Sequence, residues 1–305
     1  MLLNGAIIRM LLRISILFIL VVLGGCAQVP NTHAPQMGNL LLAEPAPVNP
    51  RAQLAIARYN YILSEATLED TEKADLFYQR GMLYDSVGLT GLAQYDYTQA
   101  LNLRPDMAEA YNSIGIHYTQ QMEFVQAYEA FDSSLDINPD YDFAFLNRGI
   151  ALYYGGRPDL ALTDLDTFLQ RDISDPYRAL WRYIAQRELE TEGALAELGE
   201  TRLQLSQDHW ATSLVDFYLG NITENKLLSS LIDGVSSQKD LTDRLCEAYF
   251  YLGKYHGARG NRGIASNYFK LALSTNVFEY VEHRYARLEL NRLRDKNVNK
   301  DVTVQ

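Results

Sequence analysis

The sequence predicts an all-α fold, a solenoid in which helix pairs stack one after another over residues 51–294. Three glycines, Gly81, Gly115 and Gly149, follow one another at intervals of 34 residues, and a fourth match surrounds Gly253. No run alternates between apolar and polar residues over five or more positions, so the sequence predicts no β-strand. A fixed period with a recurring small residue favours repeated helix pairs over an unrelated helical bundle.

The residues around each glycine explain the period in physical terms. Small residues such as Gly81 and Ala93 let the two helices of a pair approach closely, and aromatic residues such as Tyr97 fill the remaining space. Pro105 ends the second helix because proline cannot continue it. The same offsets recur around the second glycine and, in weaker form, around the third. This 34-residue pattern is typical of the tetratricopeptide repeat, so we predict a tetratricopeptide solenoid.

The repeats are assigned to residues 74–107, 108–141, 142–175 and 246–279. Residues 176–245 are helical by their apolar pattern but match the repeat poorly, and we interpret them as degenerate helix pairs that continue the solenoid. A helix over about 52–66 precedes the first repeat, and a closing helix over 280–294 follows the last. Residues 295–305 are polar, and we expect them to form a disordered tail.

Residues 1–25 carry the features of a secretory signal. Arg9 and Arg13 precede a ten-residue apolar stretch, which is short for a membrane span. The following residues, 23–26 (LGGC), resemble a bacterial lipobox, in which cleavage occurs before the cysteine and its thiol receives lipid. We therefore predict lipidation at Cys26, with an uncleaved membrane anchor or an ordinary signal peptide as the alternatives.

Residues 26–50 would join the lipid anchor to the solenoid. They contain five of the nine prolines of the chain, so we expect an extended tether. The residue after the lipidated cysteine is Ala27 rather than Asp, which by the usual sorting rule for Gram-negative lipoproteins implies the outer membrane. The solenoid would then face the periplasm. Translation from Met1 or from Met10 gives the same mature chain.

Composition argues against several functional classes. The net charge is −11 and no basic block occurs, so we expect no nucleic-acid partner. Two cysteines and five scattered histidines form no disulfide scaffold and no zinc motif, so we expect neither a metal nor another cofactor. Ser236 and Lys239 match a Ser-x-x-Lys motif, but no Lys-Thr-Gly segment accompanies it, which favours a polar loop. We interpret the chain as non-enzymatic and Cys246 as a buried small residue.

In solenoids of this type the first helix of each pair lines the concave face. Counted from the starts of the first three repeats, positions 2, 5, 9 and 12 face this groove. These positions hold Asp75, Tyr78, Met82 and Asp85, then Glu109, Asn112, Ile116 and Thr119, then Phe143, Leu146, Ile150 and Tyr153, with Tyr154 adjacent. We predict that these residues bind a partner, with packing against the next repeat as the alternative for Tyr153 and Tyr154. Since no Lys occurs among them, we expect no clamp for a C-terminal carboxylate.

Four polar side chains inside the repeats have structural interpretations. Arg80 and Arg148 both precede the repeat glycine, and we expect each to pair with acids between repeats rather than to bind a ligand. His117 and His256 fall at or near core positions of the first helix, and we interpret them as packing residues.

Several segments together resemble the lipoprotein NlpI family of Gram-negative bacteria, whose members are tetratricopeptide outer-membrane lipoproteins. The similar segments are Arg80–Ser86 (RGMLYDS), Arg104–Met107 (RPDM), Ala127–Ser133 (AYEAFDS), Leu146–Arg157 (LNRGIALYYGGR), Asp175–Trp181 (DPYRALW), Phe217–Asn221 (FYLGN), Phe250–Tyr255 (FYLGKY) and Val281–Ala286 (VEHRYA). The resemblance spans residues 51–290 and includes the degenerate middle of the chain.

This resemblance implies a homodimeric, non-enzymatic adaptor. Family members bind a periplasmic C-terminal processing protease and present murein endopeptidases to it, and they gather other peptidoglycan enzymes. Two other interpretations stay open. One is a pilotin-like or assembly lipoprotein that serves a secretin or an outer-membrane barrel machine, and the other is an enzyme that acts on the cell wall.

Overall fold

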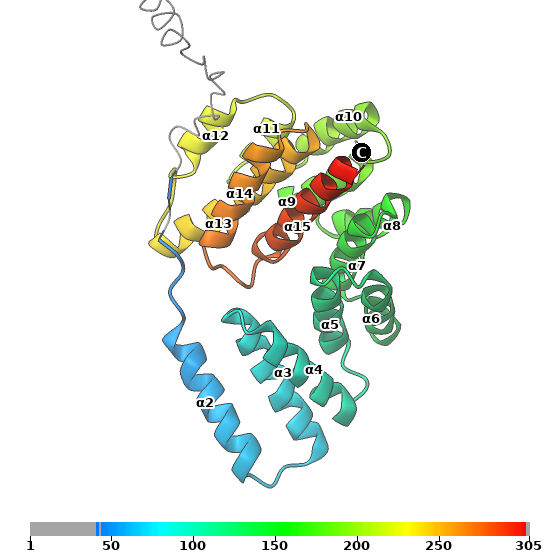
Figure 1. Ribbon diagram of the computed structural model, residues 1–305, viewed down its shortest axis with the longest axis vertical. Coiled ribbons are helices and arrows are strands. Elements are labelled where there is room, and N and C mark those ends of the chain that lie inside the picture. The colour runs from blue at the N-terminus through cyan, green and yellow to red at the C-terminus, as the bar shows by residue number, and fades with distance from the viewer. Residues whose placement is uncertain (1–40, 43, 303–305) are drawn as a thin grey trace, which may run out of the picture. The chain divides into compact units, whose positions relative to one another are not determined.

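The computed structural model describes residues 41, 42 and 44–302, and it confirms the all-α tetratricopeptide solenoid (Figure 1). The predicted signal peptide, the lipidation site at Cys26 and residues 27–40 lie outside these described residues. The helices are α2 (Pro50–Glu65), α3 (Asp70–Ser86), α4 (Thr90–Leu103), α5 (Ala108–Gln120), α6 (Phe124–Ile137), α7 (Asp142–Tyr154), α8 (Pro158–Arg171), α9 (Pro176–Arg187), α10 (Thr191–Arg202), α11 (Thr212–Tyr218), α12 (Glu224–Ser230), α13 (Gln238–Ala258), α14 (Arg262–Ser274) and α15 (Val281–Val302). The described residues contain no strand.

The repeat glycines lie where the two helices of a pair touch. A Cβ atom built on Gly115 would stand 2.6 Å from the ring of Phe131, and one on Gly253 would stand 2.6 Å from the ring of Phe269. Real side-chain carbons do not approach so closely, so only glycine leaves room for the aromatic ring of the second helix. The pairs α3–α4, α5–α6 and α13–α14 are built in this way, and in α7–α8 the side chain of Leu165 takes the place of the ring against Gly149.

Local sequence signals set several helix starts. Asn49 caps α2 through a hydrogen bond from the amide of Arg51, and Asp175 caps α9 through a bond from the amide of Tyr177. Both helices begin with proline, whose missing amide hydrogen is not needed at that position. Helices α5 and α7 begin at Ala108 and Asp142, the predicted starts of the second and third repeats.

The last repeat and the chain ends differ from the sequence expectations. Helix α13 has 21 residues and starts at Gln238, eight positions before the assigned repeat. The segment expected to be a disordered tail continues helix α15 as far as Val302, and residues 303–305 lie outside the described part. Within the described residues, no helix combines the length and the apolar character that crossing a bilayer requires.

The described part of the predicted tether, residues 41, 42 and 44–49, contains no helix or strand and is attached to the last repeat. The hydroxyl of Tyr249 donates to the carbonyl of Leu41, and the hydroxyl of Thr242 donates to the carbonyl of Glu44 at 3.3 Å. The amide of Ala46 donates to a carbonyl at the end of α14 at 2.7 Å. These bonds correct the expectation of a tether that stands free up to residue 50.

Candidate functional site

The predicted groove is only partly accessible. Five of its residues are exposed or half-buried, namely Asp75, Tyr78, Met82, Glu109 and Phe143. The other eight are buried, namely Asp85, Asn112, Ile116, Thr119, Leu146, Ile150, Tyr153 and Tyr154. For these eight, the prediction of a surface open to a partner is wrong. For Tyr153 and Tyr154 the stated alternative holds, because both rings pack against Trp181 of the next helix pair.

Helix α15 covers the part of the groove that contains Tyr153 and Tyr154. Figure 1 shows α15 alongside α13 and α14, and it also contacts the concave side of α5 and α7. The ring of Tyr285 lies 5.4 Å from the ring of Tyr154, centroid to centroid. The Tyr154 hydroxyl donates to Glu289 at 3.0 Å. The C-terminal helix therefore occupies the part of the groove that the third repeat would offer to a partner.

Hydrogen bonds within and between repeats satisfy the remaining buried polar groove residues, among which Thr119 donates to the carbonyl of Gly115 in its own helix. Asp85 accepts a hydrogen bond from Tyr97 at 2.9 Å, and His117 lies 2.9 Å from the same carboxylate. The side-chain amide of Asn147 donates to that of Asn112 at 3.0 Å. Because a buried polar group must find a partner inside the protein, these positions stabilise the stack of repeats. The buried position of His117 confirms its interpretation as a packing residue.

A buried cluster of charges joins α7, α13 and α15. Lys254 donates to Glu289 and, at 2.8 Å, to the hydroxyl of Tyr153. Its ammonium lies 4.4 Å from the ring centroid of Tyr153 and 5.1 Å from that of Tyr154. Burial lowers the pKa of Lys254, but the carboxylate of Glu289 more than reverses this and raises the pKa. Burial raises the pKa of Glu289, and Lys254 and Arg292 together bring it below its ordinary value. Both groups are therefore charged at neutral pH.

The fourth repeat supplies the lysine that the groove prediction lacked. When the register of the first three repeats is extended to a start at residue 246, positions 2 and 9 are Glu247 and Lys254. Extending the register to the fourth repeat would therefore have identified both residues from the sequence. The expectation of a groove without Lys holds for the first three repeats only.

Arginines link successive helix pairs, as expected. Arg80 forms two hydrogen bonds of 2.7 Å with Asp96 and a third with Asn60 on the preceding helix. Arg148 bonds Asp164 at 2.8 Å in its own pair and Asp132 at 2.7 Å in the preceding one. Both arginines therefore pair with acids, as predicted, but only Arg148 reaches an acid of the neighbouring repeat, because the acid of Arg80 lies in its own repeat.

The arginine series continues into the degenerate region. Arg182 lies 34 residues after Arg148, and it binds Asp166 of the preceding pair and Glu197 of its own. The sequence analysis did not identify Arg182, although its spacing from Arg148 equals the repeat period. The charged link between repeats therefore persists where the repeat glycine is already lost.

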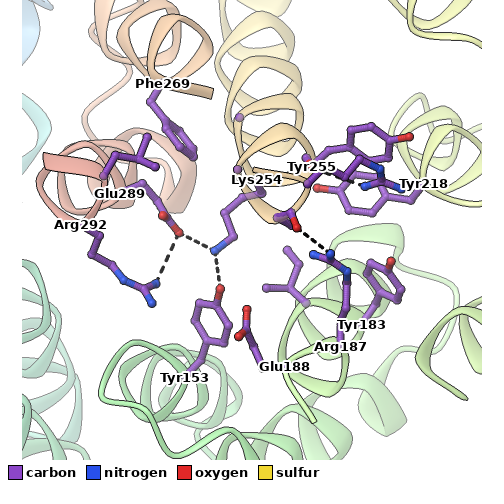
Figure 2. A pocket seen from close by; sticks show the side chains of 16 residues that line it. Tyr153, Tyr183, Arg187, Glu188, Tyr218, Lys254, Tyr255, Phe269, Glu289 and Arg292 are labelled. Atoms are coloured by element: carbon purple, nitrogen blue, oxygen red, sulfur yellow. Dashed lines mark hydrogen bonds and ion pairs between the residues drawn. The ribbon is translucent and has the colours of Figure 1, made fainter. Parts of the chain in front are cut away.

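Figure 2 shows a cavity of about 320 Å³ next to the Lys254 cluster. Its walls come from α7, α9, α11, α13, α14 and α15. Its aromatic and aliphatic lining residues include Tyr153, Tyr183, Ile184, Tyr218, Tyr255 and Phe269. Its charged lining residues are Arg187, Glu188, Lys254, Arg259, Glu289 and Arg292. The cavity combines apolar walls with convergent polar groups, as ligand sites do.

A second group of acids is buried between α13 and α15. Burial raises the pKa of Glu247, and the nearby carboxyl of Glu282 raises it further. Burial likewise raises the pKa of Glu282. Cys246 is fully buried, as predicted, and burial raises the pKa of its thiol. A thiol of this kind is not a reactive nucleophile.

The described residues contain no group of three His, Cys, Asp or Glu side chains that could hold a metal ion. In the Ser-x-x-Lys segment, Lys239 forms an ion pair with Asp243 on the next turn rather than with Ser236. Ser237 caps α13 through a bond from the amide of Asp240. His256 bonds Glu224 at 2.8 Å and stacks on Tyr268, in agreement with its interpretation as a packing residue.

No known family model matches the chain. The chain is similar to a tetratricopeptide repeat protein from Parabacteroides merdae, with 19% identity and a TM-score of 0.48 over 80% of this chain and 78% of that one. It is similar to YrrB, a tetratricopeptide protein with an unusual peptide-binding site, with 16% identity and a TM-score of 0.42 over 77% of this chain and 97% of that one. PilF of Pseudomonas aeruginosa shares 15% identity, with a TM-score of 0.38 over 78% and 97%. At these identities and TM-scores the likenesses say nothing of what this chain binds.

Proposed function

We propose that the chain is a lipid-anchored, non-enzymatic adaptor on the periplasmic face of the outer membrane. It binds a C-terminal processing protease and murein hydrolases, and so promotes the regulated turnover of peptidoglycan endopeptidases. The solenoid fold supports the binding role, since stacked repeats offer long surfaces to protein partners. The lipobox ending at Cys26 supports the anchor, and the resemblance to the NlpI family supports the choice of partners.

The observation that carries the binding role is an accessible aromatic patch at the open end of the groove, formed by Tyr78, Glu109, Tyr141 and Phe143. Phe143 is 56% exposed, and its ring lies 6.4 Å from that of Tyr141. Burial raises the pKa of Tyr78, as do the neighbouring Tyr141 and Glu109, which places these side chains together. Exposed aromatic residues contribute large contact areas at low entropic cost, so they suit the centre of a protein interface.

The mechanism we propose is proximity. An adaptor that holds a protease and its client together raises the client's concentration near the active site, to the order of millimolar for a short tether. The adaptor itself breaks no bond. Incubation of the pure protein with murein tests this directly, because any product release would contradict a non-enzymatic role.

The partner prediction is tested by affinity capture of the full chain from envelope extracts, followed by mass spectrometry. The wild type should retain a processing protease and murein hydrolases. A Tyr78→Ala/Phe143→Ala variant should lose them, whereas Leu203→Ala, at an 83% exposed residue after α10, should not. Recovery of a secretin or barrel component instead would favour the pilotin-like alternative and contradict the protease adaptor.

We also propose that the adaptor is a homodimer that associates through α2. Leu54 and Tyr61 lie two turns apart on one face of α2 and are 73% and 69% exposed. The variant Leu54→Glu/Tyr61→Glu should sediment as a monomer where the wild type sediments as a dimer. Equal sedimentation of both proteins would contradict this interface.

A further inference from the structure

The cavity of Figure 2 has an excess of positive charge in an otherwise acidic chain. Four of its lining side chains are cations, Arg187, Lys254, Arg259 and Arg292, and two are carboxylates, Glu188 and Glu289. Lys254 and Arg292 both contact Glu289, which offsets much of their charge. Glu188 lies at the exposed rim. Arg187 and Arg259 are therefore the two cations of the cavity that Glu289 does not offset.

Arg187 and Arg259 have no acidic partner among the described residues. Arg187 donates to the carbonyl of Ala258 at 2.9 Å, which places it next to Arg259. Arg259 lies 3.4 Å over the ring of Tyr255, and it reaches only the carbonyl of that residue, at 3.4 Å. Within the described part of the chain, neither guanidinium has a carboxylate within 4.0 Å.

Both guanidiniums also face the same tyrosine. Burial raises the pKa of Tyr183, and the charges of Arg187 and Arg259 both oppose this rise. Two like charges therefore act on one side of the cavity, each from a different helix end. Arg187 is the last residue of α9 and Arg259 follows α13, positions where a cation is favourable next to helix carbonyls. Each guanidinium has five N–H donors, and the carbonyl bonds use only part of them.

The rest of the cavity suits an apolar group. Tyr183, Tyr218 and Tyr255 form one wall, and Phe269 lies on another (Figure 2). Arg259 and Ala258 are exposed at the rim, so the cavity opens to solvent. A volume of about 320 Å³ is small for a ligand site. It fits the end of a peptide better than a folded surface.

We propose that this cavity binds the C-terminal carboxylate of a peptide, held between Arg187 and Arg259, with an apolar last side chain against the tyrosines. A planar carboxylate accepts paired hydrogen bonds from a guanidinium. Inorganic phosphate would share the anionic contact, but it would leave the aromatic wall unused. Glu188 at the rim would repel an acidic residue in the preceding position of the peptide. The inference does not depend on which proteins the adaptor recruits.

Isothermal titration of the full chain in mild detergent tests the proposal. The probe is N-acetyl-Ala-Ala-Phe with a free C-terminus, compared with the same peptide as its C-terminal amide and with sodium phosphate. The free acid should bind saturably, and the amide should bind roughly tenfold to hundredfold more weakly, because it loses a charge-assisted contact. Phosphate should bind more weakly than the free acid.

The matched variants are Arg187→Gln/Arg259→Gln at the cavity and Arg58→Gln at an exposed position of α2. The cavity variant should weaken binding of the free acid by tenfold or more, and the α2 variant should leave it unchanged. If the double variant fails to fold, Arg259→Gln alone, at an exposed position, replaces it. Equal binding of acid and amide, binding of phosphate alone, or unchanged binding by the cavity variant would overturn the proposal.

Discussion

The helix pairs of the first region, α3 to α8, are held together by contacts near in sequence, whereas the second region, α9 to α15, is held against them by contacts of α13 and α15 with distant residues. In the first region, Gly115 meets Phe131 and Arg148 meets Asp164, each pair only 16 residues apart. The second region is joined to α7 of the first by distant contacts, since Lys254 bonds Tyr153 across 101 residues and Tyr154 bonds Glu289 across 135. The repeat period therefore specifies the helix pairs of the first region. The packing of the second region against α7 depends on helix α15, which lies outside the period.

The largest effect is expected from breaking the distant contacts of the second region. Glu289→Gln should lower the free energy of unfolding by about 3–5 kcal/mol, because it leaves the buried Lys254 charge without its carboxylate. Urea denaturation measures this loss. Glu200→Gln, at an exposed acid of α10, is the control and should change stability by no more than about 0.5 kcal/mol. Equal midpoints for the two variants would show that the cluster does not hold α15.

A smaller effect is expected from breaking a close pair in the first region. Gly115→Val should cost about 3 kcal/mol, because its side chain would overlap the ring of Phe131. Gly91→Val on α4 is the control, since a Cβ there meets nothing within 4 Å. Thermal unfolding followed by circular dichroism compares the two. If both variants unfold at the same temperature, the close contact is not what specifies the pair.

The ion pairs that arginines form between helices should contribute still less to the free energy of unfolding. Arg148→Met should cost about 2 kcal/mol, because Asp164 is buried and would lose its charged partner. Arg104→Met should cost less than about 1 kcal/mol, because its partner Asp75 is half exposed. Urea denaturation of the two variants gives the comparison, and a larger loss for Arg104→Met would contradict it.

A further test concerns the pH dependence of the second region. The folded-state pKa values of Glu247 and Glu282 are raised, so the folded chain binds more protons than the unfolded chain above the ordinary carboxyl value of 4.5. This contribution is fully present below that value and is lost as the pH rises through the folded pKa values. Stability should therefore fall as the pH rises from about 4.5 through the folded pKa values of about 7 for Glu282 and about 8 for Glu247.

Replacing one of the two acids tests the origin of this slope. Glu247→Gln should flatten the decline in denaturation midpoint with rising pH, because it removes both a titrating group and the repulsion that acts on Glu282. Glu200→Gln should leave the slope unchanged. Identical slopes in wild type and Glu247→Gln would contradict the assignment.

Local chemistry made the regular repeats predictable. The 34-residue spacing of Gly81, Gly115 and Gly149 gave the helix pairs, and the positions of Arg80 and Arg148 gave their acidic links. Each of these signals involves residues within about one repeat of each other. The apolar pattern of the closing helix was also visible, because amphipathic spacing is local.

The accessible site was less predictable, because exposure depends on what packs against a helix. Tyr153 occupies a groove position by register and Tyr154 follows it, yet α15 covers them, and Glu289 of α15 lies 135 residues from Tyr154. The partners of Lys254 and the cavity beside it depend on the same helix. The position of Lys254 could be read from the fourth repeat, but its burial could not, since nothing local places α15 in the groove.

Hydrogen exchange of the α15 backbone amides tests most directly whether this helix fills the groove. In the full chain, amides of residues 285–293 should exchange as slowly as those around Tyr249–Lys254 in α13, because both segments are largely buried and are joined by the bond between Lys254 and Glu289. Exchange of residues 285–293 as fast as that of the exposed loop around Gly234 would contradict the account. It would also return Ile150, Tyr153 and Tyr154 to the surface that a partner can reach.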